Sequence, residues 1–323
     1  MQPEFSVTSY VSLTGGLGNQ LFQIAYALND NDFSPLNLIQ DFGRPRTNLE
    51  GDAEVFSFEL PLLRTKFKTK EANLLCRKVI GHTLKVAEHP KKWEKTKAYH
   101  TLCVFFSSIV LSLHLKRVVT LITKRRTISL GASRNSNLFY LGYFQGVENW
   151  DLDATKVILS ALRINPIRKQ LQEDIDYALH HEVTFLHMRL TDYIDEYEIG
   201  LLSVKYFEKV LEELNLNTNE AEIWIFSDDY ELARKLLVLP NNMKARFFSE
   251  KQYSVSETFH LMRCGSRYIL SNSTFGWWAA FLGKKENVQV IAPEPWFKQL
   301  RYDPSIYLAG WKKCKAHWQK NGV

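Results

Sequence analysis

The sequence has few cysteines and lacks several common catalytic signature motifs. Its 323 residues include four cysteines, Cys76, Cys103, Cys264 and Cys314, and no two of them stand at CxxC or CxxxC spacing. Zinc fingers and redox pairs built on that spacing are therefore disfavoured, and sparse cysteine is typical of a reducing compartment. The sequence also contains no Walker, GxGxxG, GxSxG or HExxH motif.

No signal peptide or membrane-spanning segment is indicated. The first residues lack the charged start and the apolar run of a signal peptide. The longest apolar stretch, Thr101 to Leu115, has 15 residues and contains three serines and a histidine. A spanning helix needs about 20 predominantly apolar residues. We therefore expect a protein that is soluble or peripheral to a membrane.

Charge is distributed unevenly along the chain. The net charge is +6, but between Arg64 and Arg126 there are 16 Lys or Arg against three acids, a balance of +13. The remainder has 25 basic and 32 acidic residues, a balance of −7. The basic segment suits an anionic membrane surface better than nucleic acid, because no nucleic-acid-binding signature accompanies it. An ordinary buried helix with solvated flanks explains the segment equally well.

The two halves of the chain differ in their hydrophobic pattern. The second half alternates predicted strands (183–188, 222–227, 244–248, 268–271, 288–292) with predicted helices (204–214, 230–237, 256–263, 275–282). Such alternation predicts a parallel sheet covered by helices. The first half contains a strand within 5–14, a glycine loop, a helix at 21–28, a strand within 139–144, and helical stretches at 74–86 and 101–122. We predict an irregular helical domain, residues 1–165, and a doubly wound domain, residues 166–323.

Three polar clusters follow predicted strands of the second half. Each lies at the carboxyl end of its strand, which is the edge at which parallel sheets bind ligands. Arg189 follows the strand at 183–188; its guanidinium could bind two phosphate oxygens or pair with Asp192. Asp228 and Asp229 follow the strand at 222–227 and could bind guanine or ribose, or cap the next helix. The small polar residues of 271–274 could present helix N-terminal N–H groups to a phosphate, or only cap that helix.

Five blocks of the sequence, in order, resemble the bacterial α-1,2-fucosyltransferases of glycosyltransferase family 11. They are GGLGNQLFQ at 15–23, GYFQ at 142–145, HMRLTD at 187–192, FSDD at 226–229 and SNSTFGWWAA at 271–280. The resemblance extends from residue 12 to about residue 297. One block alone would be weak, whereas five in order are specific.

The resemblance implies an α/β, GT-B-like enzyme with two Rossmann-like halves, an irregular acceptor half and a doubly wound donor half. It implies an inverting, metal-independent reaction without a cofactor. The catalytic residues that it implies are Arg189, His187 and Asp192. Those implied for GDP-fucose binding are Gly16, Asn19, Gln20, Arg189, Asp228, Asp229, Ser273, Thr274 and Phe275. Where the family motif has a second arginine and a glycine, this chain has Leu190 and Thr191.

The implied activity is transfer of L-fucose from GDP-fucose to the 2-hydroxyl of a galactose-type acceptor, free or lipid-linked. The product would be a surface polysaccharide such as O-antigen. The implied location is the bacterial cytoplasm, to which the basic segment adds peripheral contact with the anionic inner face of the membrane. The alternatives are a related transferase using another GDP-sugar and a non-catalytic, basic membrane-surface protein. No nucleic-acid partner is expected.

Overall fold

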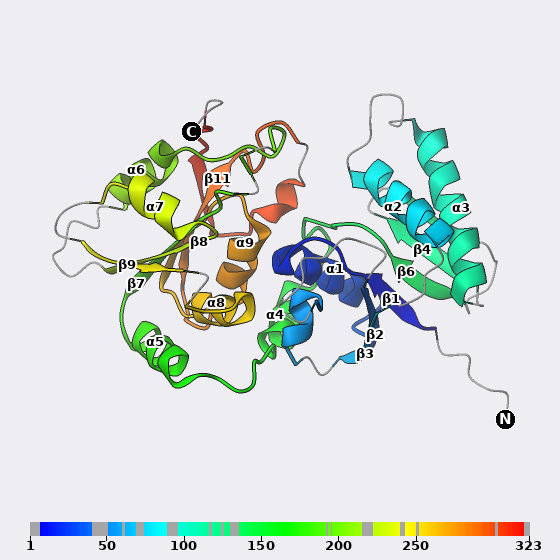
Figure 1. Cartoon of the computed structure of the whole chain (residues 1–323), viewed down its shortest axis with the longest axis horizontal. Coiled ribbons are helices and arrows are strands. Elements are labelled where there is room, and N and C mark those ends of the chain that lie inside the picture. Colours follow the sequence, from blue (N-terminus) through cyan, green and yellow to red (C-terminus); the bar gives the residue numbers. More distant parts are fainter. Residues whose placement is uncertain are drawn as a thin grey trace. The chain divides into compact units, whose positions relative to one another are not determined.

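A computed structural model gives the arrangement of most of the chain. It describes residues 7–40, 51–59, 62–68, 74–88, 96–115, 118–123, 126–129, 136–191, 193–194, 196–214, 222–239, 243–249, 252–300 and 303–319. The chain forms two compact units, Met1–Leu162 and Arg163–Val323, which Figure 1 shows in blue to green and in green to red. The division falls three residues before the predicted boundary between residues 165 and 166.

The described part of unit 1 contains a six-stranded sheet in the order β3-β2-β1-β6-β4-β5. Its strands are β1 (Ser9–Ser12), β2 (Leu36–Gln40), β3 (Leu63–Lys68), β4 (Val119–Thr123), β5 (Arg126–Ser129) and β6 (Asn137–Tyr140). Neighbouring strands are parallel except for β4 and β5 at one edge. The accompanying helices are α1 (Leu17–Asp30), the 3-10 helix η1 (Glu54–Ser57), α2 (Leu74–Glu88), α3 (Lys97–Leu115) and α4 (Leu152–Ser160).

Unit 1 is more regular than its sequence indicates, and one predicted element was wrong. Residues 101–122 are not a single helix, because α3 ends at Leu115 and β4 begins at Val119. β4 reads Val-Thr-Leu-Ile-Thr, all buried. β-Branched side chains restrict the helical conformation and pack well in a sheet, so this short run becomes a buried strand.

The described part of unit 2 contains a second six-stranded sheet, in the order β12-β11-β10-β7-β8-β9 and parallel throughout. Its strands are β7 (Val183–Met188), β8 (Glu222–Ser227), β9 (Lys244–Phe248), β10 (Arg267–Ile269), β11 (Gln289–Glu294) and β12 (Lys312–Lys315). Its helices are α5 (Lys169–His180), α6 (Val204–Glu213), α7 (Tyr230–Leu236), α8 (Val255–Met262), α9 (Thr274–Phe281) and the 3-10 helix η2 (Pro304–Ile306). The strand order is that of a Rossmann sheet, so the predicted α/β class with two Rossmann-like halves is confirmed.

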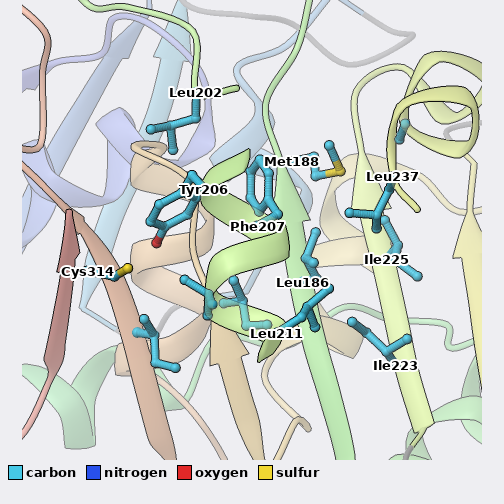
Figure 2. Packing of buried hydrophobic residues seen from close by; sticks show 14 of the residues in the cluster. Leu186, Met188, Leu202, Tyr206, Phe207, Leu211, Ile223, Ile225, Leu237 and Cys314 are labelled. Carbon is cyan, nitrogen blue, oxygen red and sulfur yellow. The ribbon is translucent and has the colours of Figure 1, made fainter. Parts of the chain in front are cut away.

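The core on one face of the second sheet fixes β7 and β8 against α6. Helix α6 buries Tyr206, Phe207, Val210 and Leu211, and all four belong to one core cluster with Leu186. In Figure 2 Leu211 lies beside Leu186, and Phe207 lies near Met188. Burying each side chain of this size contributes about 1.5–3 kcal/mol. The strands that end in the polar clusters of Arg189 and Asp228 are therefore packed against a well-formed core.

Strand β7 directs alternate side chains to opposite faces of the sheet. Leu186 and Met188 belong to the core beneath α6. Phe185 stacks on Trp224, with 5.5 Å between ring centroids, and His187 lies 5.8 Å from the ring of Phe275. His187 therefore faces α9, and the chain leaves the sheet at Arg189.

Candidate active site

The carboxyl ends of β7 and β10 meet at the switch point of the second sheet. From β7 the chain proceeds outward to β8 and β9, and it then returns to β10 on the other side of β7. Connections that leave in opposite directions open a crevice at such a point, where doubly wound sheets bind ligands. The structure thus brings the turn containing Arg189 next to the residues that lead into α9, and the third predicted cluster, that of Asp228, lies beside this turn at the end of β8.

Arg189 is paired with Asp228, from the end of the neighbouring strand β8. Its Nε lies 3.4 Å from Asp228 Oδ2, and both side chains are largely buried. The guanidinium carbon also lies 6.0 Å from the centre of the Tyr193 ring. Sequence reasoning missed this pair and proposed Asp192 instead, which lies outside the described residues. Yet β7 and β8 align Met188 with Ser227, so the next residues of both strands are neighbours.

Asp228 also fixes the turn that carries Arg189. One carboxylate oxygen accepts the Leu190 N–H at 2.7 Å, and the other accepts the Thr191 N–H at 3.0 Å and its hydroxyl at 2.6 Å. Burial opposes ionisation of Asp228, but the Arg189 charge and these hydrogen bonds hold its pKa below the usual value. Both oxygens are therefore engaged within the protein, and reading guanine with Asp228 would have to displace those bonds.

Asp229 begins α7. Its Oδ1 accepts the Leu232 N–H at 2.9 Å, which is the geometry of a helix N-cap. The capping interpretation of this residue is thus confirmed. Guanine recognition by Asp229 stays a prediction that would involve a residue already serving the helix.

His187 is buried beneath the Arg189 turn and links β7 to β10. Its Nδ1 is hydrogen-bonded to Ser271 Oγ at 3.0 Å. Burial, together with the nearby Arg189 charge, lowers its pKa to about 4 against the opposing effect of Asp228. The imidazole is therefore neutral at neutral pH. A Cβ at Gly276 would stand 3.2 Å from Nδ1, so α9 packs closely against this ring.

The start of α9 carries the other predicted donor-binding residues of unit 2. Ser273 is the N-cap, and its hydroxyl accepts the Phe275 N–H at 3.3 Å. Thr274 and Phe275 follow it and are half-buried. The buried Asn272 amide donates to the carbonyl of Gly200 at 3.0 Å. The cap interpretation is confirmed, and the first turn of α9, described in full, contains no acid.

The glycine loop in unit 1 is held from within. Buried Gln20 donates to the Gly15 carbonyl at 2.9 Å and accepts the Val55 N–H at 2.9 Å. The Glu54 carboxylate accepts the Leu17 N–H at the start of α1. Gln20 is therefore a brace of the loop, and the predicted Gly16 position is the N-cap of a helix whose first amide already contacts a carboxylate.

The first two sequence blocks meet at the carboxyl end of β6. Gln145 donates from Nε2 to Asn19 Oδ1 at 2.9 Å. A Cβ at Gly15, whose φ is +72°, would stand 2.6 Å from the Asn19 amide nitrogen and 3.2 Å from the Tyr143 ring. Asn19 is thus positioned by both blocks, and its contact with a donor stays a prediction. Among the described residues no group of three or more His, Cys, Asp or Glu could hold a metal ion.

The structure predicts that mild acid destabilises unit 2 through His187. The pKa of His187 is about 4 in the folded chain and about 6.5 in an unfolded chain. As the pH falls, the unfolded state therefore takes up the proton first. The contribution of the neutral His187 ring to the free energy of unfolding is fully present above about pH 6.5 and is lost as the pH falls toward 4. We expect this group to lower the free energy of unfolding in urea by about 2 kcal/mol between about pH 7 and 4.5.

The control for this experiment is His187→Asn, which keeps a polar group near Ser271 but cannot titrate. Its free energy of unfolding should fall less steeply with pH than that of the parent protein. Burial also lowers the pKa of His260, to about 3, but that residue is present in both proteins and cancels in the comparison. Equal pH dependence of the two proteins would contradict the prediction.

The adjacent aspartates Asp228 and Asp229 should respond differently to the same substitution. Asp228→Asn removes the charge that faces Arg189 and replaces one acceptor with a donor, so we expect a loss of about 1–3 kcal/mol in unfolding free energy. Asp229→Asn serves as the matched control, because Asn caps helices about as well as Asp, and its change should stay within about 0.5 kcal/mol. Urea titrations of both variants measure these changes. Equal losses of unfolding free energy in the two variants would show that the contacts of Asp228 with the Arg189 turn do not stabilise the fold.

Comparison with known proteins places the chain in a family. The sequence profile of Glycosyl transferase family 11 matches residues 120–315. The chain is 26% identical over 305 residues to the O-antigen biosynthesis glycosyltransferase WbnK of Escherichia coli, covering 89% of this chain and 94% of WbnK. It is 25% identical over 303 residues to an alpha-1,2-colitosyltransferase of Escherichia coli, covering 89% and 91%.

Among solved structures, the fucosyltransferase NodZ from Bradyrhizobium matches with a TM-score of 0.46 and 11% identity, over 85% of this chain and 91% of NodZ. The Escherichia coli ADP-heptose lipopolysaccharide heptosyltransferase II matches with a TM-score of 0.45 and 10% identity, over 95% and 92%. The profile match covers more than half of the chain and contains Arg189, Asp228 and the start of α9. The chain belongs to glycosyltransferase family 11.

Proposed function

We propose that this protein transfers L-fucose from GDP-fucose to the 2-hydroxyl of a galactose unit in a surface polysaccharide such as O-antigen. The observation that carries the proposal is Arg189, held by Asp228 at the carboxyl end of β7 and next to the strand that leads into α9. The reaction is inverting and needs no metal. Acceptor recognition belongs to unit 1.

The chemistry explains why an anchored arginine is needed. The bond between the sugar C1 and the phosphate oxygen breaks, and its electron pair leaves with GDP while positive charge develops on the sugar. The acceptor hydroxyl attacks C1 from the opposite face and gives up its proton. Arg189 would stabilise the charge that builds on the leaving phosphate, and the N–H groups at the start of α9 would add to this.

The relatives support the linkage and the kind of product. One of them is named an alpha-1,2-colitosyltransferase, which agrees with attack by a 2-hydroxyl. The other is named for O-antigen biosynthesis, which agrees with a surface polysaccharide. The first name also favours a second candidate, in which the transferred sugar is colitose, a deoxy relative of fucose. Leu190, which replaces an arginine of the family motif, keeps this alternative open.

Arg189→Lys should reduce kcat by about 10²–10³. Lysine keeps the charge but loses the planar fork that binds two oxygens at once, and it cannot reproduce the contact of Nε with Asp228. GDP release from GDP-fucose in the presence of a galactoside measures the loss. Arg234→Lys, at an exposed arginine on α7, is the control and should retain activity. An unchanged kcat in the Arg189→Lys variant would show that Arg189 does not stabilise the leaving phosphate in the way proposed.

The donor and the metal requirement are tested in one assay. Purified protein is given GDP-fucose, GDP-colitose or GDP-mannose with a galactoside acceptor, with and without EDTA, and the product linkage is determined by NMR. We expect GDP-fucose to give the highest kcat/KM, an α-1,2 product, and the same rate with EDTA. Preference for GDP-colitose would select the second candidate. Release of GDP from none of the donors, or full inhibition by EDTA that added metal reverses, would refute the proposal.

A further inference from the structure

Helix α3 in unit 1 has one face that belongs to the core. Val104 and Leu111 are fully buried and pack in a cluster with Ile80 of α2 and with Val119 and Leu121 of β4. Ser107 and Ser108 lie on the same side and are also buried. In Figure 1 α2 and α3 lie side by side over the strands of unit 1.

Hydrogen bonds tie this face of α3 to its neighbours. Thr83 of α2 shares a hydrogen bond of 2.7 Å with the Ser107 hydroxyl and donates to the Cys103 carbonyl at 3.2 Å. The N–H of Val119, at the start of β4, donates to Ser112 Oγ at 3.0 Å. The helix is therefore fixed in the unit along its length.

The opposite face of α3 is apolar and exposed. Leu102, Phe105, Phe106 and Leu113 are 54%, 41%, 58% and 74% exposed, and half-buried Ile109 lies between them. Their spacing places them on one side of a helix, and we call these five residues the α3 stripe. Single exposed apolar residues are ordinary, but a contiguous set on one helix marks a binding surface.

Contrary to the expectation from the 15-residue apolar stretch, α3 begins at Lys97, and by length and composition alone it could cross a bilayer. Ala98–Leu115 has a mean hydropathy of 1.5, and 28% of it is buried inside the protein. Crossing would expose Ser107 and Ser108 to lipid and would break the contacts with Thr83 and Val119. A helix that keeps those contacts can only lie along the surface.

The segment that contains α3 is strongly basic, which suits an anionic surface. The segment from Arg64 to Arg126 has a balance of +13, and its described, exposed members include Lys78 and Lys85 on α2, the helix packed against α3. Other basic residues of the segment, Lys91 and Lys92 among them, lie outside the described residues. A dimer formed through this face would bring the positively charged segments of two copies together, and their repulsion disfavours such a dimer.

We propose that the α3 stripe inserts into the boundary between headgroups and acyl chains of an anionic bilayer, and that the net positive charge of the segment containing α3 adds to the attraction. Amphipathic helices of this kind bind through buried apolar area plus attraction to anionic lipid. Such docking would hold the enzyme at a surface where lipid-linked acceptors are found. The contact is separate from the transfer reaction and is tested without any nucleotide sugar.

The test is co-sedimentation of the full chain with vesicles of phosphatidylglycerol and phosphatidylethanolamine, compared with vesicles of phosphatidylcholine alone. The parent protein should bind the anionic vesicles, and high salt should weaken the binding. The double variant Phe106→Ser, Leu113→Ser should bind at least about tenfold more weakly, because it removes two apolar groups from the lipid. The double variant Val157→Ser, Val238→Ser removes two apolar side chains, each 73% exposed, outside α3 and should bind like the parent.

Four results would overturn the proposal. The first is no binding of the parent protein to anionic vesicles, and the second is equal binding by the α3-stripe variant, with circular dichroism showing that both proteins are folded. The third is a lipid-free dimer in sedimentation velocity that the α3-stripe variant abolishes, which would assign the surface to a second copy. Resistance to alkaline carbonate extraction from membranes would instead indicate a spanning helix and would equally refute surface docking.

Discussion

The site depends on one buried carboxylate, that of Asp228. Removing a carboxylate from water is costly unless it is paired and hydrogen-bonded. Among the described residues, Asp228 meets this condition through Arg189, Leu190 and Thr191, all from the turn that follows β7. The contacts that compensate for the burial of Asp228 are therefore the same contacts that position Arg189. Any shift in the register of β7 against β8 would break these contacts.

The neighbours of Arg189 set the charge available to a ligand. Asp228 contributes one negative charge at Nε, whereas His187 beneath it is neutral because burial and the arginine itself lower its pKa. A charged imidazole there would repel the guanidinium and would break the fit between β7 and α9. The guanidinium is planar, so fixing Nε also fixes the direction in which its remaining N–H groups point. The phosphate contact proposed for Arg189 would therefore require little further ordering of its side chain.

The sequence predicted most of unit 2 because strands such as β7 and β8 are largely apolar runs that end in polar residues, whereas β12, which reads Lys-Lys-Cys-Lys, and the helix α5 were missed. Three strands match residue for residue, β7, β8 and β9. In unit 1 the short strands β2 to β5 escaped detection, and the apolar start of β4 was taken for the end of α3. The site clusters followed from the rule for strand ends, but the pairing of Arg189 did not. Asp192 is nearer in sequence, whereas Asp228 is nearer in space because parallel strands align their ends.

The helices α1 and α9 differ in the group that already contacts their first N–H groups. At α1 the first N–H contacts the Glu54 carboxylate, so a second anion there would meet like charge. At α9 the cap is the neutral hydroxyl of Ser273, and the described first turn holds no acid. A helix N-terminus attracts an anion through its unpaired N–H groups and its dipole. The proposed binding of a donor diphosphate is therefore favoured at α9 over α1, because no carboxylate occupies the described start of α9.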